Sequence, residues 1–356
     1  MTVDVPRRRL FRLGGAAAAA PIALTPLAAA AQTLPELRWR LASSFPPSLD
    51  TIFGAAEVFA QAVADATQDR FRIEVFTPGE LVPALGNLDA AAAGDIEIAH
   101  TGSYYFTDRD PAFAFGSAMP FGLNARLQNA WLDAGGGNEI LNRFYRTHGV
   151  VGLPCGNTGC QMGGWFTRPI ADRDDLAGRR MRIAGLAGQV MRDIGVDTQQ
   201  TPGGEIFDAL EAGRIDAAEW VGPYDDEKLG FYRVARYYYY PGFWEPGTTL
   251  HLFVNEAAWS GLPAPYQAAL RMAASHANAH MQAKYDIQNP AALKRLVANG
   301  VELRAFPEDV LRAAYAAAER RYAEFAEASD AFRRIFESWQ AFRGDGYLWW
   351  LVNEIA

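Results

Sequence analysis

Alternation of apolar and polar residues predicts strands near the start of the globular part of the chain. Residues 37–43 and 71–76 alternate with the period of two typical of a strand, and residues 49–66 between them carry apolar residues at helical spacing. The second strand is followed by Pro78-Gly79, a strong turn signal. This order of strand, helix and strand with short connections predicts an α/β sheet.

The same order begins again near Arg180. Residues 181–184 predict a strand, which leads through Gly185 into a helix over about 188–193. Two lobes of similar construction are therefore predicted.

A weak internal repeat supports the two lobes. Residues 93–100 can be laid over residues 212–219, and in each copy an Ala-rich helix ends at a glycine before a short strand. Ligands of open α/β sheets bind beyond the carboxyl ends of the strands. Residues 100–105 and 219–224 should therefore line a cleft between the lobes.

The last third of the chain has mostly helical spacing. After a strand predicted over 250–254, helical patterns run over about 263–299 and 307–339. The segment from residue 331 onward ends in a group of aromatic residues, Tyr347, Trp349 and Trp350. Such a segment is expected to dock on the body of the protein or on a second subunit.

The N-terminus has the features of an export signal. Four arginines, at positions 7, 8, 9 and 12, precede an apolar run over 13–31 that offers a small-residue cleavage site before Gln32. The arginine pair predicts a twin-arginine signal, with an ordinary secretory signal or an uncleaved anchor as alternatives. All three place the globular part outside the cytoplasm, and we expect residues 1–31 to be the signal.

Charge narrows the range of partners. The 356 residues are 50% apolar and 21% charged, with a net charge of −8, which becomes −11 without the first 31 residues. An acidic surface repels nucleic acid and anionic membranes, so no nucleic acid partner is expected. An anionic ligand would need locally concentrated positive charge, from arginine or from a bound metal.

The chain has two cysteines, Cys155 and Cys160. In an oxidising compartment they could form a small-loop disulfide, and the alternative is a pair of buried thiols.

Three segments place polar residues among glycines and aromatics. In 156–166, glycines allow the backbone to approach a ligand, and Asn157 and Gln161 offer amide groups, although a simple turn between strands would look similar. In 180–182, the period of two places Arg180 and Arg182 on one face, where a guanidinium forms the fork that a carboxylate fits; a surface ion pair is the alternative.

The third segment runs from Glu219 to Asp226 and is followed by the aromatic residues 237–240 and the segment 243–247. Glu219, Glu245 and the Gln161 amide could form an all-oxygen shell for a hard cation. Solvated or capping carboxylates are the alternative.

Enzyme motifs give little support to a catalytic function. The chain contains neither Gly-x-Ser-x-Gly nor His-Glu-x-x-His. His276 and His280 are one helical turn apart but lack an obvious third ligand, so a zinc site is not expected. An extracytoplasmic enzyme acting on a small carboxylate stays open as an alternative, as does a ligand-sensing binding protein.

Three strings together resemble one family: Gly-Asn-Thr-Gly-Cys-Gln-Met-Gly-Gly-Trp-Phe, Met-Arg-Ile-Ala-Gly and Glu-Trp-Val-Gly-Pro-Tyr-Asp-Asp. They are similar to those of the solute-binding subunits of tripartite ATP-independent periplasmic (TRAP) transporters, of the DctP type. The branch most similar binds 2-oxo acids or lactate together with a metal ion.

The resemblance implies a two-lobed α/β periplasmic binding protein fold with a central cleft, long elements crossing between the lobes and a C-terminal helical extension. Lobe 1 would contain residues 32–155 and about 250–285, and lobe 2 residues 156–249 and about 286–330. Residues 331–356 would form a C-terminal helix, with a homodimer as a further implication.

The resemblance also implies the roles of site residues. Arg182 would clamp the ligand carboxylate, and Gln161 would contact both ligand and cation. Glu219, the Trp220 carbonyl and Glu245 would complete the shell of a sodium or calcium ion. Two further side chains would bond the ligand's oxygen atoms, Asn157 and Tyr105, with Tyr104 as an alternative to Tyr105.

The function implied is capture of a small 2-oxo monocarboxylate, of the pyruvate type, in the periplasm and its delivery to the membrane subunits of a TRAP transporter, without catalysis. Lactate or another 2-hydroxy acid is the alternative ligand.

Overall fold

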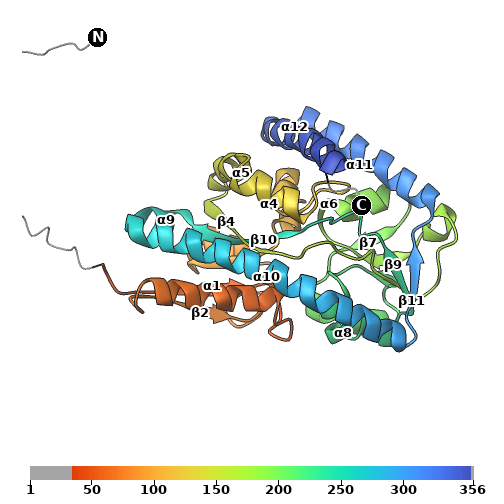
Figure 1. The fold of residues 1–356 in the computed structure, drawn as a ribbon, viewed down its shortest axis with the longest axis horizontal. Coiled ribbons are helices and arrows are strands. Elements are labelled where there is room, and N and C mark those ends of the chain that lie inside the picture. The colour runs from red at the N-terminus through yellow and green to blue at the C-terminus, as the bar shows by residue number, and fades with distance from the viewer. Residues whose placement is uncertain (1–33, 354–356) are drawn as a thin grey trace, which may run out of the picture. The chain divides into compact units, whose positions relative to one another are not determined.

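Two mixed β-sheets, each with helices packed against it, form the part of the chain that the structure describes (Figure 1). The structure is a computed structural model that describes residues 34–353. The predicted signal sequence, residues 1–31, lies outside the described residues.

The first sheet has five strands in the order β2-β1-β3-β10-β4. β1 pairs in parallel with β2 and β3, and β10 runs antiparallel to β3 and β4. The strands are β1 (Leu37–Ser43), β2 (Phe71–Phe76), β3 (Ile98–Thr101), β4 (Val150–Asn157) and β10 (Thr249–Asn255). The strands predicted over 37–43 and 71–76 are confirmed. We call this sheet and the helices packed on it lobe 1.

The second sheet has six strands in the order β11-β9-β5-β8-β6-β7. Its strands are short: β5 (Trp165–Phe166), β6 (Arg180–Arg182), β7 (Asp197–Gln199), β8 (Ala217–Ala218), β9 (Tyr237–Tyr240) and β11 (Glu302–Ala305). β6 pairs in parallel with β7 and β8, which brings the carboxyl ends of β6 and β8 to the same edge. We call this sheet and its helices lobe 2.

Nine shorter helices surround the sheets: α1 (Ile52–Ala66), α2 (Asn87–Ala93), α3 (Ala114–Ser117), α4 (Ala125–Asp133), α5 (Gly137–Arg146), α6 (Gly185–Asp193), α7 (Ile206–Glu211), α8 (Pro223–Leu229) and α9 (Glu256–Gly261), all within residues 34–353. Five 3₁₀ turns connect them: η1 (Ser103–Phe106), η2 (Pro111–Phe113), η3 (Arg173–Leu176), η4 (Gly203–Glu205) and η5 (Phe231–Arg233).

The internal repeat is present in the structure. Gly94 and Gly213 follow α2 and α7 and both have the left-handed backbone that glycine adopts without strain, with φ values of 83° and 62°. In each lobe a short strand comes next, β3 or β8. The segments predicted to line the cleft therefore leave their sheets in equivalent ways.

Helix α10 (Ala264–Ala298) is shared by both lobes. It contacts α1 and β4 of lobe 1 and α8 of lobe 2, and Figure 1 shows it running across the molecule from α1 to α8. The helix predicted over 263–299 is confirmed, although Pro290 lies inside it. The α/β class and the long element crossing between the lobes are thus confirmed.

The helix predicted over 307–339 is wrong as a single element, because the chain forms two helices there, α11 (Glu308–Ala328) and α12 (Asp330–Asn353). The residue between them, Ser329, has an extended backbone with φ −134° and ψ 119°. Its hydroxyl oxygen accepts a hydrogen bond from the N–H of Phe332 at 3.2 Å, as an N-cap does. Serine caps a helix start better than it continues a helix, so the chain turns at this residue and α12 packs against α11.

Helix α12 forms the predicted C-terminal extension. Its first half packs on Phe115 of α3, with ring centroids of Phe332 and Trp339 at 4.8 and 5.9 Å. The lobe boundaries given above stay a prediction, because residues 35 onward pack as one unit.

Candidate functional site

A buried ion pair between Arg182 and Glu219 lies at the centre of the site. Arg182 is the last residue of β6, and Glu219 follows β8, the neighbouring strand. Nη1 of Arg182 donates to Oε2 of Glu219 at 2.9 Å and to the Glu219 main-chain oxygen at 2.6 Å. Parallel pairing of β6 and β8 therefore determines this contact.

Other protein groups contact part of the remaining Arg182 guanidinium. Nε donates to the carbonyl of Thr201 at 3.1 Å, and the Trp220 ring lies 4.9 Å from the guanidinium carbon, a cation–π distance. Within residues 34–353, Nη2 makes no hydrogen bond. One arm of the guanidinium thus has no hydrogen-bond partner among the described residues, on a residue that is only 1% exposed.

Arg180, at the other end of the same strand, has a different role. Its side chain is 45% exposed and pairs with Asp216 at 3.0 Å, so for Arg180 the surface ion pair is the correct interpretation. Arg180 lies at the exposed start of β6, whereas Arg182 lies at its buried end.

Gln161 and Glu245 meet through a threonine that the sequence reasoning missed. The Thr248 hydroxyl donates to Oε2 of Glu245 at 2.6 Å and accepts from Nε2 of Gln161 at 2.9 Å. Nε2 of Gln161 also donates to the Thr158 hydroxyl at 3.0 Å. The amide nitrogen is thereby held by protein, which leaves the amide oxygen directed elsewhere. The sequence signal for this contact was the hydroxyl of Thr248, three residues after Glu245.

Two buried oxygens at this site lack a hydrogen-bond donor among the described residues: Oε1 of Gln161 and Oε1 of Glu219. Leaving a buried acceptor unpaired costs about 1–3 kcal/mol. A hard cation binds carboxylate and amide oxygens of this kind. The unpaired oxygens therefore fit a metal ligand set of Gln161, Glu219, Glu245 and the Trp220 carbonyl.

The set is poor in acidic side chains for a metal site. The described residues contain no group of three or more His, Cys, Asp or Glu side chains arranged to hold a metal. Two carboxylates, an amide and a carbonyl leave room for oxygens from a ligand to complete the shell.

The pKa values indicate a shortage of positive charge. Burial raises the pKa of Glu245 to about 7, against the opposing effects of the Thr248 hydroxyl and Arg182. Burial raises the pKa of Glu219 as well, and the charge of Glu245 adds to that effect while Arg182 opposes it. One guanidinium does not balance two carboxylates at this depth, and a cation would.

Tyr104 and Tyr105 reach the site from lobe 1, in the turn η1 that follows β3. Their ring centroids are 4.4 Å apart, and both are buried. Burial raises the pKa of each phenol, while the charge of Arg182 lowers it, so both lie within electrostatic reach of the guanidinium. Either ring can meet a ligand here, and the choice of Tyr105 stays a prediction.

The two lobes touch beside these tyrosines. Gly185, at the start of α6, has a φ of +63°, and a Cβ added to it would lie 2.9 Å from Cβ of Tyr104. The Gln200 amide donates to the carbonyl of Tyr105 at 3.2 Å. Glycine at position 185 thus allows lobe 2 to close directly onto η1.

Asn157 ends β4, close to the loop that carries Gln161. Its amide nitrogen donates to Thr249 at 3.2 Å and to Asn129 at 3.4 Å, and its amide oxygen accepts from the N–H of Gly159 at 2.9 Å. These bonds shape the loop. A ligand contact would use the second lone pair of the oxygen, and the predicted contact stays a prediction.

Aromatic side chains close the site to water. Trp165, Trp220, Phe243 and Trp244 are all at most 6% exposed.

Cys155 is buried and Cys160 is exposed, and these two described thiols are not joined, so both the predicted disulfide and the predicted pair of buried thiols are wrong. No helix in residues 34–353 is long and apolar enough to cross a membrane.

Two lobes with a shared long helix, and a buried guanidinium at the edge of one sheet, are the features expected of a two-lobed solute-binding protein. The chain matches the family model "Bacterial extracellular solute-binding protein, family 7" (DctP) over residues 42–329. The chain therefore belongs to this family of solute-binding proteins, which is not a family of enzymes.

Individual relatives narrow the comparison. A monocarboxylate 2-oxoacid-binding periplasmic protein of Nostoc sp. (strain PCC 7120) is 48% identical over 323 residues, covering 91% of this chain and 88% of its own. A TRAP transporter solute-binding protein of Bordetella bronchiseptica RB50, a mixed-occupancy dimer with copurified calcium and picolinate, superposes with a TM-score of 0.89 at 43% identity, covering 90% of this chain and 95% of its own.

A TRAP periplasmic solute-binding protein of Pseudoalteromonas atlantica with bound sodium and pyruvate gives a TM-score of 0.87 at 35% identity, covering 90% of this chain and 97% of its own.

Proposed function

We propose that this periplasmic protein captures a small 2-oxo monocarboxylate of the pyruvate type, together with a sodium or calcium ion, and delivers it to the membrane subunits of a TRAP transporter. The observation that carries the proposal is the convergence of one buried guanidinium with two unpaired buried oxygens, those of Gln161 and Glu219. The similarity to the 2-oxoacid-binding and pyruvate-bound relatives supports it.

Arg182 would bind the carboxylate of the ligand. Its free Nη2 can donate to one carboxylate oxygen while Nη1 stays bonded to Glu219, and such charge-assisted bonds are about twice as strong as neutral ones. The Trp220 ring, 4.9 Å from the guanidinium carbon, adds a cation–π contact to the bonds that hold Arg182 in place.

The cation would be held by Gln161, Glu219, Glu245 and the Trp220 carbonyl. When bound, it would supply the positive charge that these protein oxygens and an anionic ligand need. A divalent ion with Arg182 would balance both carboxylates and the ligand, whereas sodium would leave one negative charge. The buried walls described above exclude water and strengthen every one of these contacts.

Asn157 and Tyr105 would make the remaining polar contacts with the ligand, with Tyr104 as the alternative to Tyr105. A ligand of about six heavy atoms reaches a micromolar dissociation constant only if nearly every polar atom is paired. Buried polar side chains from both lobes, such as Tyr105 of lobe 1 and Arg182 of lobe 2, would supply these contacts.

Calorimetry tests the proposal. Protein unfolded and refolded to remove any bound ligand would be titrated with pyruvate and with lactate, each with sodium, calcium or a chelator. We expect tight binding of pyruvate that needs a cation and leaves the ligand unchanged. Absence of binding by any short 2-oxo or 2-hydroxy acid would contradict the ligand class, and equal affinity with chelator would contradict the cation.

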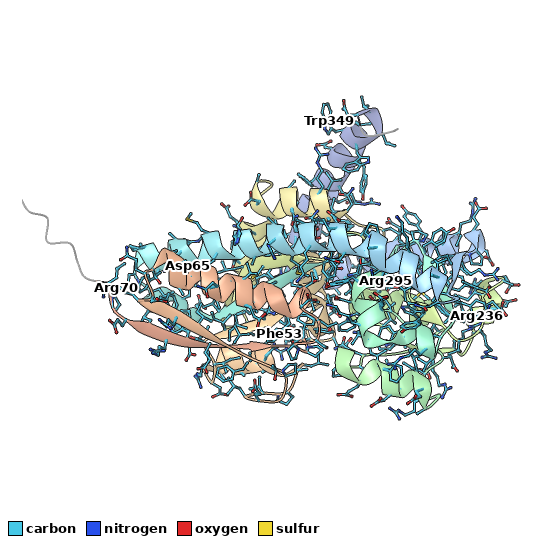
Figure 2. The ribbon with its side chains drawn as sticks, turned by 60° about the horizontal axis from the view of Figure 1, so that its bottom comes forward. Phe53, Asp65, Arg70, Arg236, Arg295 and Trp349 are labelled. Carbon is cyan, nitrogen blue, oxygen red and sulfur yellow. The ribbon has the colours of Figure 1, made fainter. Side chains whose placement is uncertain are left out.

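We further propose that α12 supports a homodimer. One face of the helix is docked, because the Tyr347 hydroxyl donates to the carbonyl of Gly122 at 2.7 Å and the Trp350 ring lies 5.4 Å from the Arg126 guanidinium carbon. Beyond Tyr347, four apolar side chains are 60–74% exposed, and the end of α12 that carries Trp349 projects from the body (Figure 2): Leu348, Trp349, Leu351 and Val352. An exposed apolar turn of this kind is what a second copy could cover.

A further inference from the structure

One buried carboxylate next to the cation site receives hydrogen bonds from four groups. Asp226 is 1% exposed and lies in the first turn of α8. Its Oδ2 accepts from the Trp165 indole at 2.8 Å and from the Tyr238 hydroxyl at 2.6 Å. Its Oδ1 accepts from the N–H groups of Val221 and Gly222 at 3.3 and 3.2 Å.

The two N–H groups belong to the segment that carries the proposed metal ligands. Val221 and Gly222 directly follow Glu219 and Trp220 in the chain. Because Asp226 holds both peptide units, it restricts the orientation of the Trp220 carbonyl, which is part of the peptide bond to Val221.

The side-chain donors tie the same carboxylate to the other metal-binding segment. Trp165 begins β5, at the end of the loop that carries Gln161, and the N–H of Met162 in that loop donates to the Val221 carbonyl at 3.1 Å. Trp165 stacks on Tyr238 with ring centroids 4.0 Å apart and an angle of 15° between the planes. The stack aims both donors at one oxygen.

The neighbouring acid provides a comparison. Asp225 is equally buried, yet its Oδ2 accepts from Tyr285 of α10 and its Oδ1 has no hydrogen-bond partner among residues 34–353. It makes no bond to the segment 219–222. Two adjacent buried carboxylates therefore face different parts of the protein.

We propose that Asp226 is a positioning residue for the cation site: it fixes the 219–222 segment to the Gln161 loop, so that the Trp220 carbonyl and the side chains of Glu219 and Gln161 face the same hard cation. The inference rests on the proposed function. Partners that orient metal ligands in this way typically change metal affinity by about 10–100-fold when removed.

The test measures calcium binding in two variants. Calcium would be titrated into chelator-treated protein held in saturating pyruvate, with thermal unfolding followed in parallel. In Asp226→Asn one accepting oxygen is replaced by an NH₂ group, which cannot accept the hydrogen bonds that its neighbours donate. We expect the half-saturating calcium concentration to rise about 10–100-fold. Tyr238→Phe keeps the charge of Asp226 and the ring stack but removes one donor, so a smaller rise, of about 3–10-fold, is expected.

Asp225→Asn is the matched control. It removes a buried negative charge one residue away without touching the 219–222 segment, so calcium affinity should stay within about 2-fold while thermal stability changes. Folded variants at positions 226 and 238 with unchanged calcium affinity would overturn the inference, as would an equal loss in Asp225→Asn. If Asp226→Asn does not fold, Tyr238→Phe decides alone. If the unmodified protein binds pyruvate with sodium and not with calcium, sodium replaces calcium in all of these titrations. Failure of the unmodified protein to bind pyruvate with either cation would overturn the proposed function itself.

Discussion

Nη1 of Arg182 lies 2.9 Å from Oε2 of Glu219, and each side chain is only 2% exposed. A buried pair of this kind contributes little net stability, because both charges lose their hydration, but removal of one partner leaves the other charge buried and alone. Position 182 therefore affects both the fold and the proposed ligand site.

Arg182→Lys should abolish tight binding and keep the fold. Lysine preserves the charge beside Glu219 but lacks the second arm that would reach the ligand, so we expect the affinity for pyruvate to fall at least about 100-fold. Arg182→Ala should in addition lower the free energy of unfolding by about 3–5 kcal/mol. Calorimetry and thermal unfolding measure the two effects.

Arg180→Lys controls for the loss of an arginine from the same strand. Its partner is the exposed pair with Asp216, and exposed pairs contribute about 0–1 kcal/mol, so affinity should stay within about 2-fold. A comparable loss of affinity in both variants would contradict the assignment of Arg182.

The ligand-free protein should lose stability as the pH rises from 6.5 to 8.5. Burial raises the pKa of Glu245 to about 7, far above the value of its unfolded form. At pH 6.5 the folded state therefore still holds a proton that the unfolded state has already lost, so the free energy of unfolding falls as the pH rises and levels off at about pH 8, once the folded carboxyl has ionised. The raised pKa of Asp225, about 7, acts in the same direction.

Thermal unfolding across this pH range tests the sign. Glu245→Gln removes the contribution of Glu245 and should flatten the dependence, while also weakening cation-dependent binding. His100 and His251, whose pKa values burial lowers to about 3, act in the opposite direction below the ordinary histidine value, so the window begins at 6.5. A ligand-free protein that gains stability from pH 6.5 to 8.5 would contradict the prediction.

Asp50→Asn should speed release of the ligand. Asp50 precedes α1 in lobe 1, and its carboxylate accepts from Lys228 and Tyr224 of α8 in lobe 2 and from Lys284 of α10, the latter two at 3.2 and 2.9 Å. These bonds join the lobes at the surface. Exposed pairs contribute about 0.2–1 kcal/mol each, so we expect the dissociation rate to rise about 3–10-fold.

Stopped-flow tryptophan fluorescence would measure that rate. Glu97→Gln is the control, because the Arg40–Glu97 pair is similarly exposed but lies within lobe 1. The effect of Asp50→Asn should shrink at high salt. Equal rates in the unmodified protein and in Asp50→Asn would show that the lobes are held closed by other contacts.

Trp349→Glu should shift a dimer toward monomer. Trp349 is 64% exposed on the projecting end of α12, where a charge would have to be buried in the proposed interface. Met272→Glu, at a position 74% exposed on α10, controls for the loss of an exposed apolar residue. Sedimentation velocity would report a monomer for the unmodified protein if the dimer proposal is wrong.

The sequence predicted those elements whose pattern is local. Alternation predicted the exact bounds of β1 and β2, because residues 38–41 and 71–74 alternate between exposed and buried positions. The break at Ser329 was not visible, since apolar spacing continues through it and only the serine cap marks the turn.

The sequence motifs predicted which residues form the candidate site, but not how those residues are arranged. The structure brings Arg182, Glu219, Gln161 and Glu245 together. The sequence alone does not distinguish Arg182 from Arg180, because the two residues differ only in which end of the strand they occupy. The bond between Thr248 and Gln161, and the bonds from Trp165 and Tyr238 to Asp226, join segments that only tertiary structure makes adjacent.

Helix α10 packs against both lobes along its 35 consecutive residues. Neither lobe can lose its structure without uncovering apolar surface of the other, because the same helix would have to detach from α1 and from α8. The protein should therefore melt in one cooperative transition, and separation of the lobes would have to bend or partly detach α10 as well as move the connections from β4 to β5 and from β9 to β10.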